Sequence, residues 1–339
     1  MTRPGSDQEA AEPDRPQDSS RSRQRAAGAR GFLRMLMAVM LAPPQEANGQ
    51  SSTLSGGVDA RFSHESAPTN SNVELAGLFL NLRKVWSDDA GDRWIGVGQV
   101  DFDHNFQDVR PYQVYLQYKG PLGKWNLRAG HFLLPFGLLA TYDTERLVLQ
   151  GLEEASLGIR KDTGIQALGH FGRWDYALAL TLGVGDRRLL PLDNSRLLTG
   201  RLAYVGDAGQ VGLSVLAGRL LPDAGDGSPR VRDEWRLGAD ATKSLGRLTV
   251  RAEALGGATE GRAVGGGIVL ADYALRPRLE LNTRAAYWRE ESEPYAVGIG
   301  LTYRPWSRLY LRVADSQVFG ERDSNAFTAQ VYFEFSRAF

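Results

Sequence analysis

Few residues of this 339-residue chain have the types and spacings that catalysis or metal binding requires. The four histidines, His64, His104, His131 and His170, lie far apart and do not have the spacing of a metal site. Nothing in the sequence places a serine and a histidine together as nucleophile and base. The chain has no cysteine, which excludes disulfides and thiolate ligands. We therefore expect no enzymatic activity, no metal and no cofactor.

Three other motifs are incomplete. The glycines at 265–267 are not followed by the Lys-Ser/Thr pair of a phosphate-binding loop. The stretch DAGDGS at 223–228 lacks the downstream glutamate of a calcium loop. Glu153 and Glu154 are adjacent but have no partner base, so we interpret them as solvated loop charge. The chemistry that remains is the placement of charges along the chain.

The composition excludes two classes of protein. Lys+Arg and Asp+Glu both number 40, and a net charge of zero removes the electrostatic basis for a nucleic-acid partner. Apolar residues make up 42% of the chain, yet the mean hydropathy is −0.32 and the long apolar runs of a helical membrane protein are missing. The length suits two ordinary domains or one large barrel.

The beginning of the chain differs from the rest. Residues 1–30 are polar and charged, which is typical of a disordered segment. Arg30 and Arg34 then lead into a short apolar stretch followed by small residues, which is the layout of a secretory signal peptide. A short amphipathic helix is the alternative. We expect residues 1–49 to be a disordered lead plus signal peptide, and residues 50–339 to form the folded domain.

From Leu54 onward, apolar and polar side chains alternate in runs of about eight to eleven residues, as in LTVRAEA at 248–254. Short links such as KGPLGK at 119–124 alternate with longer ones such as HESAPTNSN at 64–72. Sixteen such runs begin near residues 54, 73, 94, 111, 125, 163, 175, 197, 211, 234, 248, 264, 279, 295, 308 and 326. An even number of strands joined in this way predicts a transmembrane antiparallel β-barrel of about 16 strands.

Aromatic residues gather at the two ends of the apolar faces, as expected for the girdles of a barrel that spans a bilayer. Beside the short turns these residues are Trp94, Tyr118, Trp125, Tyr176, Tyr204, Tyr273, Tyr303 and Phe335, and beside the long loops they are Tyr112, Trp235, Tyr287, Tyr295 and Phe327. The polar face of each strand is therefore expected to line a lumen, while the apolar face contacts lipid.

The chain closes with AFTAQVYFEFSRAF, in which apolar residues alternate up to a final Phe339. This ending resembles the C-terminal signature of bacterial outer-membrane proteins, which the assembly machinery reads. Arg337 departs from that signature, since the family usually has an apolar or aromatic residue there. The resemblance implies an integral protein of a Gram-negative outer membrane, with both termini in the periplasm and Phe339 as its assembly signal.

The longest connection follows the fifth strand. Around it, LRAGHFLLPFG, TER and GIRKDTGIQ resemble the phosphate-selective (O/P-type) porin superfamily over roughly residues 125–170. In sixteen-stranded porins the third outer loop folds into the lumen, so the resemblance implies an infolded third outer loop that constricts a pore. A loop that folds outward over the barrel mouth is the alternative. The constriction is expected to contain Pro135, Phe136, Gly137, Asp143, Glu145, Arg146, Glu153, Glu154, Arg160 and Lys161.

Strand alternation also assigns residues to the pore wall. The predicted wall includes Arg83, Asp101, Arg128, Arg201, Arg236, Arg251, Arg284 and Arg312. Acidic and basic lumen positions are equal in number, and no ring of one charge is visible, so anion specificity is not predicted. Alternatively, many of these arginines pair with neighbouring carboxylates and serve only as wall structure.

These observations predict an outer-membrane porin, a water-filled channel for passive diffusion of small hydrophilic solutes and ions. The resemblance implies that its partners are the lipid bilayer, the solutes and two further copies in a homotrimer. One alternative is a barrel that sheathes a multihaem cytochrome partner and so conducts electrons across the outer membrane. A barrel enzyme is the second alternative.

Overall fold

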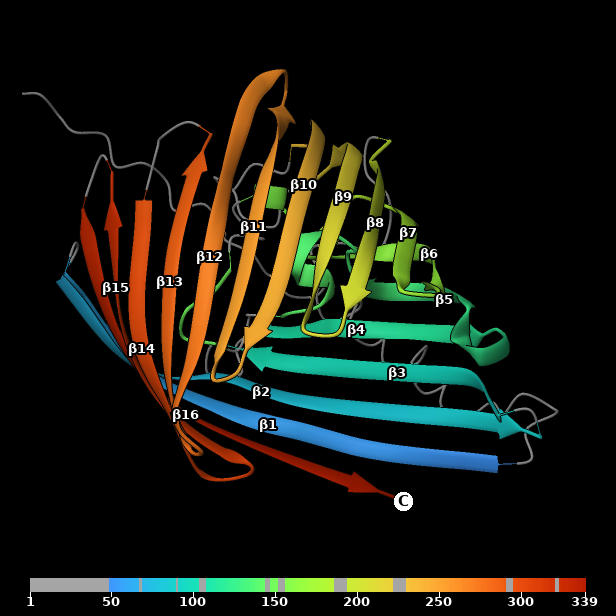
Figure 1. Cartoon of the computed structure of the whole chain (residues 1–339), viewed down its shortest axis with the longest axis horizontal. Coiled ribbons are helices and arrows are strands. Elements are labelled where there is room, and N and C mark those ends of the chain that lie inside the picture. The colour runs from blue at the N-terminus through green and yellow to red at the C-terminus, as the bar shows by residue number, and fades with distance from the viewer. Residues whose placement is uncertain are drawn as a thin grey trace, which may run out of the picture.

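The computed structural model describes residues 49–66, 69–89, 91–103, 108–143, 147–151, 156–185, 194–221, 230–290, 295–320 and 323–339. They form a closed antiparallel barrel of sixteen strands (Figure 1). No helix in these ranges is long and apolar enough to cross a membrane. The predicted lead and signal peptide lie outside the described residues, except for Gly49.

The strands are β1 (Gly49–Ser66), β2 (Thr69–Asp88), β3 (Gly91–Asp103), β4 (Asp108–Lys119), β5 (Trp125–Leu133), β6 (Lys161–Phe171), β7 (Trp174–Thr181), β8 (Arg196–Gly206), β9 (Gly209–Leu220), β10 (Arg232–Leu245), β11 (Leu248–Thr259), β12 (Arg262–Arg276), β13 (Leu279–Arg289), β14 (Tyr295–Trp306), β15 (Leu309–Phe319) and β16 (Ser324–Ala338). The sixteen predicted strands are confirmed, and their starting residues differ from the predicted ones by at most five.

Alternation of side chains separates the two faces of the barrel. On β9, Leu213 and Val215 are exposed on the outer face, whereas Ser214 between them is buried on the inner face. On β11, Arg251 and Glu253 have the same inward parity. A slip of one residue in any strand would exchange these faces, so the apolar pattern fixes the register.

Aromatic side chains pack against one another on the outer face near the short turns. The rings of Trp94 and Tyr118 lie 5.1 Å apart, and those of Tyr118 and Trp125 lie 5.4 Å apart. These residues belong to β3, β4 and β5, so they form a continuous row across three neighbouring strands. This row agrees with the predicted sorting of aromatic residues by height.

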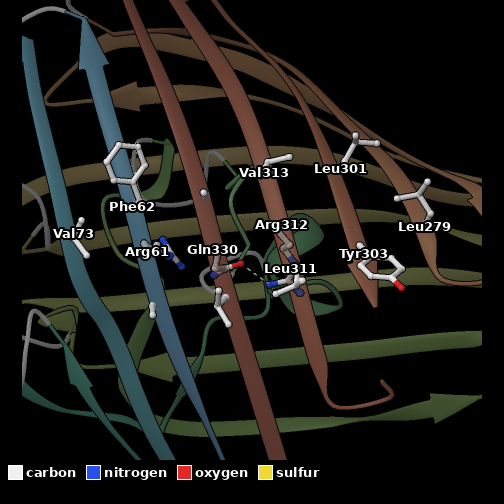
Figure 2. A pocket seen from close by; sticks show the side chains of 13 residues that line it. Arg61, Phe62, Val73, Leu279, Leu301, Tyr303, Leu311, Arg312, Val313 and Gln330 are labelled. Carbon is white, nitrogen blue, oxygen red and sulfur yellow. Dashed lines mark hydrogen bonds between the residues drawn. The ribbon is translucent and has the colours of Figure 1, made fainter. Parts of the chain in front are cut away.

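The barrel closes where β1 pairs with β16, and Figure 1 shows the C-terminal end of β16 beside β1. Inside this seam, the Gln330 Nε2 atom donates to both carboxylate oxygens of Asp59 at 2.8 Å. The Oε1 atom of Gln330 accepts a 2.7 Å hydrogen bond from Arg312, which Figure 2 shows as a dashed line. Arg61 donates to the same Asp59 at 2.7 Å. A buried polar network thus joins β1, β16 and β15.

We predict that Gln330→Leu lowers the free energy of unfolding by about 3 kcal/mol, because it removes partners from two buried charged groups. Urea unfolding, followed by the electrophoretic mobility of the folded barrel, measures this change. Gln317→Leu, at an exposed position on β15, is the matched control and should change stability little. Equal stability of the two variants would contradict a stabilising role for the network.

Candidate functional site

The connection between β5 and β6 turns away from the wall at Pro135. Its base is closed by a 2.9 Å hydrogen bond from the Leu134 amide to the Arg160 carbonyl. A short 3₁₀ turn, η2 (Gly137–Ala140), follows Phe136. Gly137 has a φ of +49°, a left-handed conformation that glycine adopts without steric cost. The described parts of this connection (134–143, 147–151 and 156–160) are called the inner segment below.

Two side chains of the barrel wall hold the beginning of η2. The Gly137 amide donates to the Ser214 hydroxyl at 2.9 Å, and the Leu138 amide donates to the Glu253 carboxylate at 2.6 Å. Ser214 and Glu253 belong to the inner face of β9 and β11. These amides have no acceptor within so short a turn, so the wall satisfies them. A side chain at Gly137 would overlap the Glu253 carboxylate.

An apolar core lies between the inner segment and the inner face of the wall. The ring of Phe136 covers Gly238, where a Cβ atom would come within 2.9 Å of the ring. The core consists of Leu134, Phe136, Leu139, Leu157 and Ile159 from the segment, and Leu197, Leu216, Leu220, Leu255, Val264 and Trp288 from the wall. The expectation that the inner faces are polar is therefore wrong at these six wall positions, because the segment covers the wall there.

A second apolar contact continues toward β14. Leu138 packs with Ile268 and Leu270 of β12. Farther along the segment, Leu149 lies against Gly298, where a Cβ atom would be 2.6 Å from the leucine side chain. The absence of a side chain at Gly298 lets the segment approach the wall closely.

Two of the predicted wall arginines bind the backbone of the inner segment. Arg236 donates from Nε to the Ser156 carbonyl at 2.9 Å, and Arg284 donates from Nη1 to the Gln150 carbonyl at 2.9 Å. Arg236 is 1% exposed and pairs with Glu234 at 3.2 Å, so it is a buried anchor.

Other predicted wall residues pair within the wall. Arg201 and Asp240 form an ion pair at 2.5 Å, as do Arg251 and Asp272. Asp101 is buried and accepts a 3.1 Å hydrogen bond from Gln99. Arg201, Arg236 and Arg251 therefore each pair with a neighbouring carboxylate, and their role as wall structure stays a prediction.

Arg83, Arg128 and Arg312 differ from these. Arg128 donates to Gln117 at 2.9 Å and stacks on Tyr115, without a carboxylate partner in the described part of the chain. Arg83 is exposed and makes no ion pair with a described residue. Arg312 lies over aromatic rings and binds Gln330. Arg83 and Arg128 are therefore the predicted wall arginines that make no ion pair with a described residue, while the buried carboxylates Asp59 and Asp101 lie on the same wall.

The predicted charges of the connection are only partly described. Arg160 donates to Asp143 at 2.5 Å, and the Tyr112 hydroxyl donates to the same carboxylate. Lys161 lies 4.1 Å over the Tyr112 ring. These four side chains meet where β6 begins. The remaining predicted residues, Glu145, Arg146, Glu153 and Glu154, lie outside the described residues.

A pocket of about 250 Å³ lies between the inner segment and the wall. Tyr142 and apolar residues 147–149 line one side, and Asp272, Glu280 and Arg312 are among the polar residues that line the other. The Arg251 guanidinium lies 3.8 Å over the Tyr142 ring. This pocket therefore has an apolar side and a side with charges of both signs.

The structure corrects one expectation about catalysis. His64 Nδ1 lies 2.8 Å from the Ser71 hydroxyl, although no such pair was predicted. The two residues are cross-strand neighbours in the exposed β1–β2 hairpin. His131 lies beside Thr163, and His104 is outside the described residues. Within the described ranges, no group of three or more histidine, aspartate or glutamate residues is placed to hold a metal.

No family model and no curated protein matches the chain. Solved structures do match it. An anion-selective porin from Comamonas acidovorans has a TM-score of 0.67 at 13% identity, over 85% of this chain and 100% of that chain. OmpT, an outer membrane protein of Vibrio cholerae, has a TM-score of 0.69 at 10% identity, over 85% and 100%. OmpF of Salmonella typhi has a TM-score of 0.62 at 10% identity, over 84% and 97%.

The fold is the porin fold. At these identities the likeness concerns the fold alone, and it agrees with the porin resemblance of the sequence. The narrower resemblance to the phosphate-selective superfamily stays a prediction. The sequence did contain a signal for the covered wall, because Leu216, Leu255 and Ile268 are apolar at inward positions.

We predict that Gly137→Ala weakens the anchoring of η2 to the wall. Hydrogen exchange at the Gly137 and Leu138 amides should become at least about tenfold faster, because alanine pays 1–2 kcal/mol in the left-handed conformation and also overlaps Glu253. Gly172→Ala is the control, since Gly172 has a φ of +59° but open space around it. Equal protection of these amides in both variants would contradict the proposed anchor.

We predict that Tyr142 ionises at a higher pH than an ordinary tyrosine. Burial, followed by the nearby Asp272 carboxylate, raises the pKa of Tyr142 from 10.0 to about 12, although Arg251 opposes this shift. The neutral form is favoured in the folded state, so the stability it contributes is lost as the pH rises from 10.0 to about 12. Tyr142→Phe should remove the part of the tyrosinate absorbance that appears at the highest pH. An unchanged titration curve would contradict this assignment.

Proposed function

We propose that this protein is an outer-membrane porin, a water-filled channel through which small hydrophilic solutes and ions diffuse passively. The observation that carries the proposal is a closed sixteen-strand barrel whose inner wall holds a segment of the chain while its outer face stays apolar. Exposure of such an apolar outer face to water is unfavourable, whereas its contact with lipid chains is favourable. A closed barrel also satisfies its backbone groups without an open edge, as a bilayer requires.

The proposal gives the inner segment the role of the constriction. It is fixed against β8 to β13, so solutes would pass between the segment and the wall that carries Arg83, Arg128 and Arg312. Most other wall arginines are neutralised by carboxylates or bind backbone carbonyls. We therefore expect weak ion selectivity and no dedicated anion specificity.

The remaining parts of the proposal concern placement in the membrane. Both termini and the short turns would face the periplasm, residues 1–49 would be the lead and signal peptide, and Phe339 would serve assembly. The C-terminal end is held in the barrel, since Phe339 and Ser52 exchange backbone hydrogen bonds of 2.9 and 3.1 Å. A homotrimer is the assembly that the porin resemblance implies.

The two other candidate functions lack a supporting observation. A cytochrome sheath needs a wide lumen, whereas the inner segment packs inside this barrel. A hydrolase needs a base that is itself oriented by a third group. The structure pairs His64 with Ser71 in an exposed hairpin, where no such group is seen among the described contacts.

We predict steady single-channel conductance when the refolded barrel is inserted into a planar bilayer. Deletion of residues 140–158 should raise this conductance roughly twofold, because the open cross-section of a barrel sets its aqueous path. Deletion of residues 222–229, in the link between β9 and β10, is the control and should change it little. A salt gradient should give a small reversal potential. A folded barrel that inserts but conducts no ions would overturn the proposal.

A further inference from the structure

Basic residues occupy equivalent positions in three successive short turns. The carbonyls of Arg247, Arg278 and Arg308 each accept a backbone hydrogen bond of 2.8 or 2.9 Å. The donor amides belong to β12, β14 and β16, respectively. Each arginine directly precedes the leucine that begins β11, β13 or β15. Because two inter-strand spacings separate these positions, the arginines stand about 10 Å apart along the rim.

Further basic side chains reach the outer face at the same end of the barrel. Register places Lys243 opposite Val250, Arg276 opposite Leu279 and Arg337 opposite Leu54, all on the outer face. Lys243, Arg276 and Arg337 are exposed and make no ion pair with a described residue. The turns that join β10 to β11, β12 to β13 and β14 to β15 contain no acidic residue. This set, together with Arg247, Arg278 and Arg308, is called the basic rim.

The opposite side of the barrel does not share this imbalance. There, Arg93 pairs with Asp88 at 2.6 Å, and Arg173 pairs with Asp207 at 3.2 Å. Lys119 pairs with Asp92 at 3.4 Å. Carboxylates therefore neutralise Arg93, Lys119 and Arg173 on that side, although Lys124 and Arg173 occupy the same turn position there as Arg247 does. Beside the basic rim, Arg304 pairs with Glu280 at 3.3 Å, whereas the rim residues Lys243, Arg276 and Arg337 make no ion pair with a described residue.

An apolar groove of about 590 Å³ lies on the outer face next to the basic rim. The border of the groove nearer the basic rim is a row of cross-strand neighbours: Leu279, Tyr303, Leu311, Val331 and Ala60. Figure 2 labels the first three of these residues. Four inter-strand spacings give this row a length of about 19 Å. The row begins directly beside the turns of the rim.

A second row, two residues farther along the strands, completes the groove. In this second row, Phe62 and Val313 lie on either side of Ala329. Figure 2 labels Phe62 and Val313. The small side chains of Ala60 and Ala329 leave the depression between larger neighbours. The first row, about 19 Å long, exceeds the roughly 15 Å of hydrocarbon that one leaflet contributes to a bilayer.

We propose that the groove and the basic rim together bind an anionic phospholipid. An acyl chain lies in the groove, and the phosphate contacts Arg276 and Arg308 at the rim. Tyr303 lies at the junction, where an amphipathic ring suits the boundary between acyl chain and headgroup. The inference goes beyond the channel function, although it rests on the proposed membrane location.

Charge complementarity favours a lipid over a second copy of the chain. A second copy placed symmetrically on this face would bring the same basic rim against the first, and the like charges would repel. An anionic headgroup instead neutralises the rim, because basic clusters beside an apolar membrane surface attract anionic lipids.

Native mass spectrometry of the refolded barrel, titrated with phosphatidylglycerol or phosphatidylethanolamine of equal chain length, tests the proposal. Wild-type protein should bind phosphatidylglycerol more tightly. The double variant Arg276→Gln, Arg308→Gln should lose roughly fivefold in affinity for phosphatidylglycerol for each charge removed, the change that about 1 kcal/mol per charge produces. The matched control Lys124→Gln, Arg173→Gln should change this affinity little. Ala329→Phe, which fills the groove, should weaken binding of both lipids.

Three outcomes would overturn the inference. They are equal binding of the two lipids by wild-type protein, equal losses in the test and control variants, and an oligomer that Ala329→Phe dissociates and that excludes lipid. The comparison of lipids on wild-type protein needs no variant to fold. A barrel that conducts ions without lipid preference contradicts only the lipid site, whereas a barrel that fails to enter bilayers contradicts the proposed channel.

Discussion

Closing a sheet satisfies its ladder of backbone hydrogen bonds only when the first strand pairs with the last. Here β1 meets β16 in continuous register from Thr53↔Ala338 to Glu65↔Ala326. The network of Asp59, Gln330 and Arg312 lies inside that seam, so closure is reinforced by side chains where the chain ends must find each other. Everything enclosed by the barrel, including the inner segment, depends on this closure.

The enclosed space is asymmetric because the inner segment covers only one part of the wall. Against β8 to β13 the contact resembles an ordinary protein core, with Phe136 on Gly238 and leucines on both sides. Backbone amides at its edge are bound by Ser214 and Glu253. The other part of the wall keeps its polar and aromatic side chains. The arginines thus divide into anchors such as Arg236, paired wall groups such as Arg251, and groups without a carboxylate such as Arg128.

Much of the fold could be predicted from the sequence, because a barrel strand carries its signal locally. Alternation over a few residues specifies both the strand and the face on which Arg251 or Leu213 lies. The anchoring of the inner segment could not be predicted in this way. The contact of Gly137 with Glu253 joins residues far apart in the chain, and local pattern contains no information on such pairs. Pro135 and Gly137 were predicted to lie in the constriction, but the sequence does not indicate which part of the wall receives them.

The central claim is that inward positions face a water-filled lumen and outward positions face lipid. The chain has no cysteine, so single cysteines can be introduced one at a time and tested with a membrane-impermeant thiol reagent in liposomes. Asn282→Cys, beside the pocket, should react quickly, whereas its neighbour Leu281→Cys on the outer face should not. Leu216→Cys, beneath the inner segment, should react only after deletion of residues 140–158. Equal reaction at positions 281 and 282 would contradict the account.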